Sequence, residues 1–208
     1  MKQVPYRLAE ALENICKRKS LENITVSEIT SEAGVTRQVF YHHFTDKFEL
    51  ASWIHYVHLY RSVKQALEEN TQQIWHGIAL CWLKQLEKNR AFYVNAFQSA
   101  SQREFQRIIR DFFFASYQWQ LEQLLKRGLT EEELFAVRVY CIGGLEMVYE
   151  WVSKGTSPAS ERIAEMLEYA MPEFIHENVV KSQGIPYAEV LKTMEEYLSK
   201  EGLLLGIS

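Results

Sequence analysis

The chain has 208 residues, of which 47% are hydrophobic and 24% are charged, and its formal net charge is −4. This balance is typical of a globular protein with a sizeable core and excludes a disordered chain. The sequence has no uncharged apolar run of about 18 residues and no signal-peptide-like stretch near its start, so we expect a cytoplasmic protein with no membrane partner.

Positive charge gathers near the start of the chain. The first 48 residues hold seven Lys and Arg side chains against six acidic ones, whereas the remaining 160 residues carry a net charge of −5. A local basic face is enough to meet phosphate groups, so the acidic total does not exclude a nucleic-acid partner.

Apolar residues recur every three or four positions along the chain, which predicts an all-α fold. In the first third, this pattern predicts four helices, over about residues 5–18, 25–33, 36–44 and 46–69. Thr25 and Glu28 form a capping box at the start of the second helix, Gly34 ends it, and Thr36 caps the third.

The same periodicity continues through the rest of the chain. It predicts helices over about residues 72–88, 90–98, 102–127, 131–154 and 157–175, with Pro158 in the first turn of the last one. A final amphipathic helix is expected after Pro186, with Val190, Leu191, Met194 and Leu198 on one face, followed by the apolar residues Leu203, Leu204 and Leu205.

Residues 24–50 carry the most informative motif: two short helices joined by a tight turn at Gly34. Ile29, Ala33, Val35 and Phe40 have the spacing to fill the space between these helices. The outer face of the second helix would then present Thr36, Arg37, Gln38, Tyr41 and His42. Arg and Gln can form paired bonds to guanine and adenine edges, and Thr, Tyr and His can bond phosphate oxygens. The motif therefore predicts a DNA-reading helix-turn-helix.

A family pattern accompanies this chemistry. The pattern consists of residues at fixed spacing: Thr25, the run Ala33, Gly34, Val35 and Thr36, the pair Phe40 and Tyr41, and then Phe44 and Lys47. In these positions the segment of about residues 5–55 resembles the N-terminal domain of TetR-family regulators. The resemblance implies an N-terminal three-helix helix-turn-helix domain and a C-terminal helical bundle for regulation and dimerisation, with no enzymatic activity. We accordingly expect domains at residues 1–50 and 51–180 and a C-terminal helical extension at 181–208.

The resemblance also implies roles for individual residues. Thr25, Tyr41 and Lys47 would contact phosphates, while Thr36, Arg37, Gln38 and His42 would face the groove. The family pattern often has a small residue where Gln38 and Val39 stand, which leaves the base preference open. Alternative interpretations are that Tyr41 is an aromatic at the edge of the core, or that the domain binds a protein and no longer DNA.

The helix over residues 131–154 contains Gly143 and Gly144 in its middle, each costing about 1 kcal/mol relative to alanine. Such a pair indicates close approach of another helix, and two helices from each subunit would form a four-helix dimer interface. The candidate dimerisation residues are Val137, Cys141, Gly144, Leu145, Val148, Ile163, Met166, Leu167 and Ala170. Alternatively, the two helices bury these residues inside one subunit.

The middle helices are rich in aromatic residues, some of which could line an apolar cavity for a small-molecule effector. The candidate lining residues are Trp82, Phe92, Phe97, Phe112, Tyr117 and Tyr140, with ordinary core packing as the alternative. Residues 89–93, together with Gly143, Gly144, Trp151, Ser157 and Pro158, also resemble the C-terminal domain of dihydroxyacetone-kinase-type regulators within the same family.

Catalytic and metal-binding patterns are weak. His55 and His58 lie one turn apart without a third ligand, and we interpret them as surface histidines. Cys16, Cys81 and Cys141 are widely spaced and predict reduced thiols rather than disulfides or a zinc site. We therefore expect no cofactor and no metal.

Together, these features predict a homodimeric transcription regulator that binds a double-stranded DNA operator, with a repressor released by a small-molecule effector as the first hypothesis. An activator or regulator controlled by a partner protein is the alternative, and a helical ligand-binding or enzymatic protein without DNA activity is a third.

Overall fold

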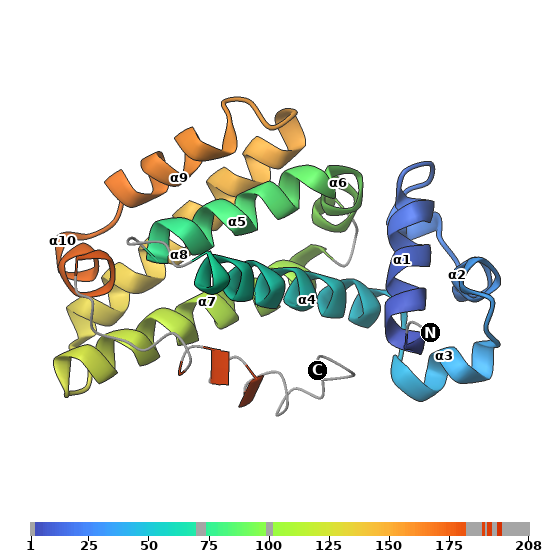
Figure 1. Ribbon diagram of the computed structural model, residues 1–208, viewed down its shortest axis with the longest axis horizontal. Helices are drawn as coiled ribbons and strands as arrows, with labels where there is room; N and C mark the ends of the chain where they lie inside the picture. The colour runs from blue at the N-terminus through green and yellow to red at the C-terminus, as the bar shows by residue number, and fades with distance from the viewer. Residues whose placement is uncertain are drawn as a thin grey trace.

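The computed structural model describes residues 3–69, 74–98 and 102–181, together with 189, 191, 192, 195 and 196. Every regular element in these residues is a helix, which confirms the all-α prediction (Figure 1). The helical extension expected at residues 181–208, with Val190, Met194, Leu198 and the apolar residues 203–205, lies outside the described residues except at Lys181 and the five isolated positions.

The first three α-helices form a small unit at one end of the molecule, which we call the head (Figure 1). They are α1 (Val4–Cys16), α2 (Val26–Ala33) and α3 (Arg37–His43), with a 3₁₀ turn (Leu21–Asn23) before α2. The predicted capping box is present at the start of α2, where the Thr25 side chain accepts from the Glu28 N–H and Glu28 accepts from the Thr25 N–H. Local sequence therefore fixes the head's helix boundaries to within about two residues.

Helix α4 (Lys47–Glu68) leaves the head and runs into the centre of the larger helical unit, which we call the body (Figure 1). The Asp46 carboxylate caps it, accepting from the N–H groups of Phe48 and Glu49 at 2.8 Å each. Helix α4 packs against α1, α5 and α7, and all residues from 50 to 59 are buried. The interpretation of His55 and His58 as surface residues is therefore wrong: neighbouring helices surround α4 and leave their rings 1% and 4% exposed.

The remaining helices of the body are α5 (Ile74–Lys88), α6 (Arg90–Gln98), α7 (Gln102–Leu125), α8 (Glu131–Lys154) and α9 (Ser160–Tyr169). The helix expected over residues 157–175 begins at Ser160 and ends at Tyr169. A short α10 (Glu173–Ile175) and a π-helical turn (His176–Val180) follow the break. Pro172 explains the break, since it has no N–H to donate and its ring collides with the preceding turn of a helix.

One continuous hydrophobic core joins the head to the body. It includes Leu8 and Leu12 of α1, Trp53 and Val57 of α4, and Val152 of α8, each at most 4% exposed. Apolar contacts therefore cross the boundary without a gap, and α4 packs against helices of both units. Within the described residues, no helix is both long enough and apolar enough to cross a lipid bilayer.

Candidate nucleic-acid interface and regulatory cavity

Helix α3 is held by a single buried side chain. Phe40 is the only buried residue of α3; it is 0% exposed, and its ring centroid lies 6.0 Å from that of Phe44. Thr36 caps the helix, its hydroxyl oxygen accepting from the Val39 N–H at 3.3 Å. The five residues predicted to meet DNA from this helix are all exposed: Thr36, Arg37, Gln38, Tyr41 and His42. The structure therefore brings them together on the outward side of one short helix.

The turn before α3 has a specific anchor in α1. Gly34 has a left-handed backbone conformation (φ 63°), and the Arg7 guanidinium donates to the carbonyl oxygens of Ala33 and Gly34. The left-handed backbone favours glycine at position 34, and a Cβ there would lie 3.0 Å from Arg7 Nη2 and would displace this guanidinium. Arg7 fixes the end of α2 and hence the direction in which α3 starts. Sequence reasoning missed this role because nothing in the motif itself points 26 residues back.

Lys47, predicted to contact phosphate, forms hydrogen bonds within the head. Its ammonium donates to the carbonyl oxygens of Glu22 at 2.6 Å and Ile24 at 2.8 Å, and it lies over the Phe48 ring. Partial burial lowers the pKa of this amine from its usual value. An ammonium has three protons, so two hold the turn before α2 and one is left for a phosphate.

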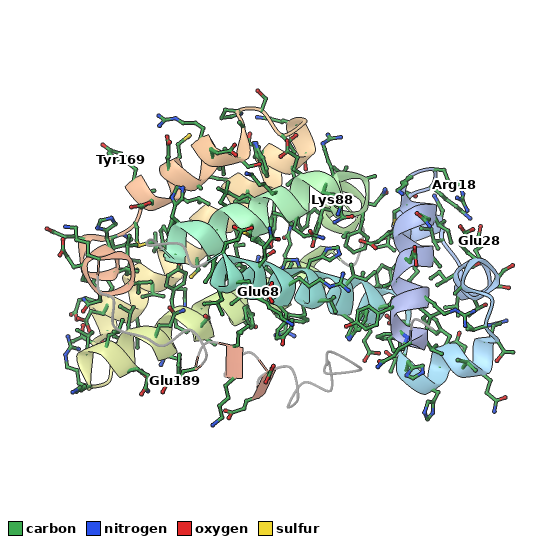
Figure 2. All side chains as sticks on the ribbon, viewed as in Figure 1. Arg18, Glu28, Glu68, Lys88, Tyr169 and Glu189 are labelled. Atoms are coloured by element: carbon green, nitrogen blue, oxygen red, sulfur yellow. The ribbon has the colours of Figure 1, made fainter. Side chains whose placement is uncertain are left out.

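The exposed basic residues of the head differ in how they are paired. Arg18 forms an ion pair with Glu32 at 3.0 Å, and Lys19 forms one with Glu28 at 2.6 Å. The Lys19 contact and the capping bonds from Thr25 lower the pKa of Glu28 to about 2. Arg18 and Glu28 lie on the same side of the head (Figure 2). Arg37, in contrast, forms no hydrogen bond or ion pair with any residue that the structure describes, so its guanidinium is available to a ligand.

The body contains a cavity of about 120 Å³ between α4, α5, α7, α8 and α9. Four of the six residues predicted to surround a ligand line it: Trp82, Phe112, Tyr117 and Tyr140. Phe92 and Phe97 are buried but lie outside this lining. The Phe97 ring packs on Tyr149 instead, with centroids 4.1 Å apart.

A chain of hydrogen bonds crosses one wall of the cavity. The Trp75 indole N–H donates to the Tyr117 hydroxyl at 2.7 Å, Tyr117 is hydrogen-bonded to Tyr140, and the Tyr140 hydroxyl donates to the Leu167 carbonyl at 3.0 Å. Burial raises the pKa of both phenols well above the usual range. These four residues come from α5, α7, α8 and α9, so the chain fixes the relative positions of four helices around the cavity.

A polar contact at His58 joins the head to the body. His58 of α4 lies with Nε2 3.2 Å from Glu13 Oε1 of α1, and its Nδ1 is 2.8 Å from the Tyr93 hydroxyl of α6. Nε2 therefore faces the Glu13 carboxylate while Nδ1 is hydrogen-bonded to the Tyr93 hydroxyl, so this one ring lies between α1 and α6. Close by, Asn95 of α6 donates to the Cys16 carbonyl at the end of α1 at 2.9 Å.

Helix α8 presents apolar residues on two sides. Val137, Cys141, Leu145 and Val148 are at most 5% exposed within the chain, and Ile163 of α9 is 9% exposed. Gly144 faces α9, where a Cβ would lie 3.4 Å from Leu167. Val137, Cys141, Leu145, Val148 and Ile163 pack inside one subunit, whereas Gly144 and Leu167 are half-buried, and Leu167 lines the cavity. The assignment of these residues to a dimer interface stays a prediction.

The opposite side of the same two helices carries the exposed apolar surface, which we call the α8–α9 face. It comprises Phe135, Val139, Ile142, Met147, Met166 and Tyr169, which are 49% to 93% exposed. Tyr169 points away from the body (Figure 2). Of the predicted dimerisation residues, Met166 and Ala170 are exposed alongside it. Within the described residues, no three His, Cys, Asp or Glu side chains are placed to share a metal ion.

Two family models match the sequence. Residues 9–52 match the model described as bacterial regulatory proteins of the tetR family, and residues 73–173 match a transcriptional regulator C-terminal region. The chain is 29% identical over 91 residues to the HTH-type dhaKLM operon transcriptional activator DhaS of Lactococcus lactis subsp. lactis (strain IL1403). That alignment covers 43% of this chain and 46% of the relative, so the match spans about half of its length.

Solved structures resemble the fold over most of the chain. The structure titled dihydroxyacetone kinase operon activator DhaS has a TM-score of 0.56 at 20% identity, over 84% of this chain and 96% of that chain. The crystal structure of RolR without ligand has a TM-score of 0.50 at 13% identity, over 91% of this chain and 96% of that chain. At these identities the likeness shows the fold alone.

Proposed function

The chain belongs to the TetR family of bacterial transcription regulators, and we propose that it binds a specific double-stranded DNA operator through α3 as a homodimer. The observation that carries this proposal is the exposed face of α3, which gathers Arg37, Gln38 and His42 around the single buried anchor Phe40. Arg37 and Gln38 would bond base edges in the major groove, and Thr25, Tyr41 and the third proton of Lys47 would hold phosphates. Thr36 and His42 would also face the groove.

Replacing Arg37 with alanine tests the proposed base contacts. A paired arginine–guanine contact contributes about 1–3 kcal/mol, so we expect the affinity for the native promoter to fall by about tenfold to a hundredfold. Arg18→Ala is the matched control, since Arg18 is an exposed arginine of the same head whose partner is Glu32. Titrations of labelled promoter DNA measure both variants, and an unchanged affinity in Arg37→Ala would remove this residue from the interface.

We propose that the α8–α9 face joins two copies of the chain. A two-fold dimer through this face buries the same apolar residues from both subunits and presents two heads to half-sites about 34–36 Å apart. The α8 residues Phe135, Val139, Ile142 and Met147 support the proposal, since an exposed apolar patch of this kind is unusual on a monomer.

A charge placed in this face should separate the subunits. Ile142→Glu puts two like charges close together across a two-fold interface, so we expect the dimer dissociation constant to rise at least about a hundredfold. Gln123→Glu, an exposed position on α7, adds the same charge elsewhere and should leave the dimer intact. Analytical ultracentrifugation gives the result, and an Ile142→Glu chain that stays dimeric would place the interface on another surface.

The sign of regulation has two candidates. A repressor released by a small molecule is supported by the cavity, because a ligand there touches Leu59 and Val63 of α4, the helix that enters the head. An activator controlled by a partner protein is supported by the relative from Lactococcus lactis, whose name describes it as an activator. Transcription from the native promoter with purified protein separates them: a repressor lowers the signal, and an activator raises it.

A further inference from the structure

The cavity in the body is lined by uncharged groups. All the described residues that line it are apolar, aromatic or neutral polar side chains, and its only ionisable groups are Tyr117, Tyr140 and Cys141. Burial raises the pKa of the Cys141 thiol to about 12 and raises the pKa values of the two phenols well above their usual range, so all three groups are neutral at physiological pH. An ion that entered would lose its hydration without meeting an opposite charge, which strongly disfavours its binding.

The size of the cavity limits the occupant to about one ring. Its volume is about 120 Å³, and an engineered cavity of about 150 Å³ in another protein binds benzene. Aromatic side chains supply much of the wall, among them Trp75, Trp82, Phe112 and Phe113. Such walls favour a planar aromatic guest, because ring faces and edges pack against one another with preferred geometry.

Hydrogen bonding defines the occupant further. The indole N–H of Trp75 already donates to Tyr117, and the hydroxyl of Tyr140 already donates to the Leu167 carbonyl. Tyr117 is hydrogen-bonded to both Trp75 and Tyr140. The Trp82 indole lines the same cavity and is 5% exposed, yet its buried N–H has no hydrogen-bond partner among the described residues. A buried donor without a partner loses free energy, which a ligand with an accepting oxygen would restore.

We propose that this cavity binds an uncharged, single-ring aromatic compound with a hydrogen-bond-accepting oxygen, and that the Trp82 N–H is the donor to that oxygen. The binding site rests on the geometry of the body alone, whereas the regulatory consequence rests on the proposed function. Leu59 and Val63 of α4 lie in the cavity wall next to His58, whose ring contacts Glu13 of the head. An occupant therefore acts on the helix that orients the DNA-binding surface.

The test uses the full chain and three ring compounds of nearly the same size: phenol, toluene and benzoate. Isothermal titration should detect phenol and toluene and should detect no binding of benzoate. Trp82→Phe keeps an aromatic ring but removes the donor. We therefore expect the affinity for phenol to fall about threefold to tenfold, the effect of one hydrogen bond, while the affinity for toluene changes little. The ratio of the phenol affinity to the toluene affinity is compared between the unchanged chain and Trp82→Phe, because this comparison cancels the difference in hydration between the two compounds.

Two further variants complete the test. Trp53→Phe is the matched control, because the Trp53 indole N–H is also buried and without a hydrogen-bond partner among the described residues but lies outside the cavity lining. Ala79→Leu fills the cavity without touching the donor, and it should abolish binding of both neutral rings even if Trp82→Phe fails to fold. Benzoate binding as tightly as phenol, an equal loss of phenol and toluene in Trp82→Phe, or ring binding that survives Ala79→Leu would overturn the proposal.

Promoter titrations with and without phenol keep this inference separate from the proposed function. Promoter binding by a chain that takes up none of the three rings would overturn the ligand inference alone. Ring binding with the expected selectivity by a chain that does not bind DNA would overturn the proposed function and leave the cavity assignment standing.

Discussion

Replacing Phe40 with alanine is expected to weaken promoter binding at least about a hundredfold, because α3 loses its only buried side chain. Truncation of a fully buried phenylalanine costs about 3–5 kcal/mol, and here the loss falls on the helix proposed to read DNA. Phe97→Ala is the matched control, since Phe97 is 3% exposed and lies in the body. Promoter titrations below the melting temperature of both variants compare the two.

We expect the Phe97→Ala chain to be destabilised to a similar extent and still to bind the promoter. Equal loss of binding in both variants would show that the defect is general instability. Normal binding by the Phe40→Ala chain would contradict the assignment of α3 as the recognition helix.

The contact of Glu13 with His58 should show strong energetic coupling between head and body. His58→Leu leaves the Glu13 carboxylate, whose side chain is 22% exposed, without the ring that faces it, and we expect a loss of about 1–2 kcal/mol in free energy of unfolding, the cost of a polar group left without its partner. Glu13→Leu is expected to cost less, because the His58 ring keeps its hydrogen bond with Tyr93. The double variant removes both polar groups and should be more stable than His58→Leu.

Urea denaturation of the four proteins measures this coupling. The expected interaction energy is at least about 1 kcal/mol, which exceeds the usual error of additivity for independent sites. Strictly additive losses would mean that the two residues contribute separately and that the contact does not connect the two units.

The head could be predicted from the sequence because its determinants are local. Thr25 and Glu28 are three residues apart, Thr36 caps the helix that it precedes, and Gly34 takes the left-handed conformation that the turn requires. Phe40 was expected inside by its spacing alone, and it is fully buried. Each of these signals acts within about one helical turn, the range over which sequence patterns are most reliable.

The body was harder to predict because its determinants are distant in sequence. Helix α8 has Val137 and Leu145 on one side and Val139 and Ile142 on the other, so apolar periodicity cannot tell the inner side from the outer one. The predicted dimerisation set for this reason combines inner residues such as Val137 with the exposed residues Met166 and Ala170. The predicted cavity residues Phe92 and Phe97 show a similar limit, because an aromatic side chain in a core and one in a cavity wall have the same spacing.

Buried polar contacts were missed altogether. His58 reads as a surface residue until the structure places Glu13, 45 positions earlier, and Tyr93, 35 positions later, against its two ring nitrogens. Lys47 was expected to meet phosphate, yet two of its protons bond carbonyl oxygens that lie 25 and 23 residues before it. In both cases the partner is supplied by the fold and leaves no signal in the local sequence.

The central claim, specific recognition of DNA, is tested most directly by one titration series. The full chain is titrated with a promoter fragment recovered by selection from the host genome, and with an unrelated fragment of equal length, at increasing salt. We expect the promoter to bind at least about a thousandfold more tightly, with the logarithm of affinity falling linearly against the logarithm of salt concentration. Equal affinity for both fragments, or no binding to either at low salt, would contradict the account.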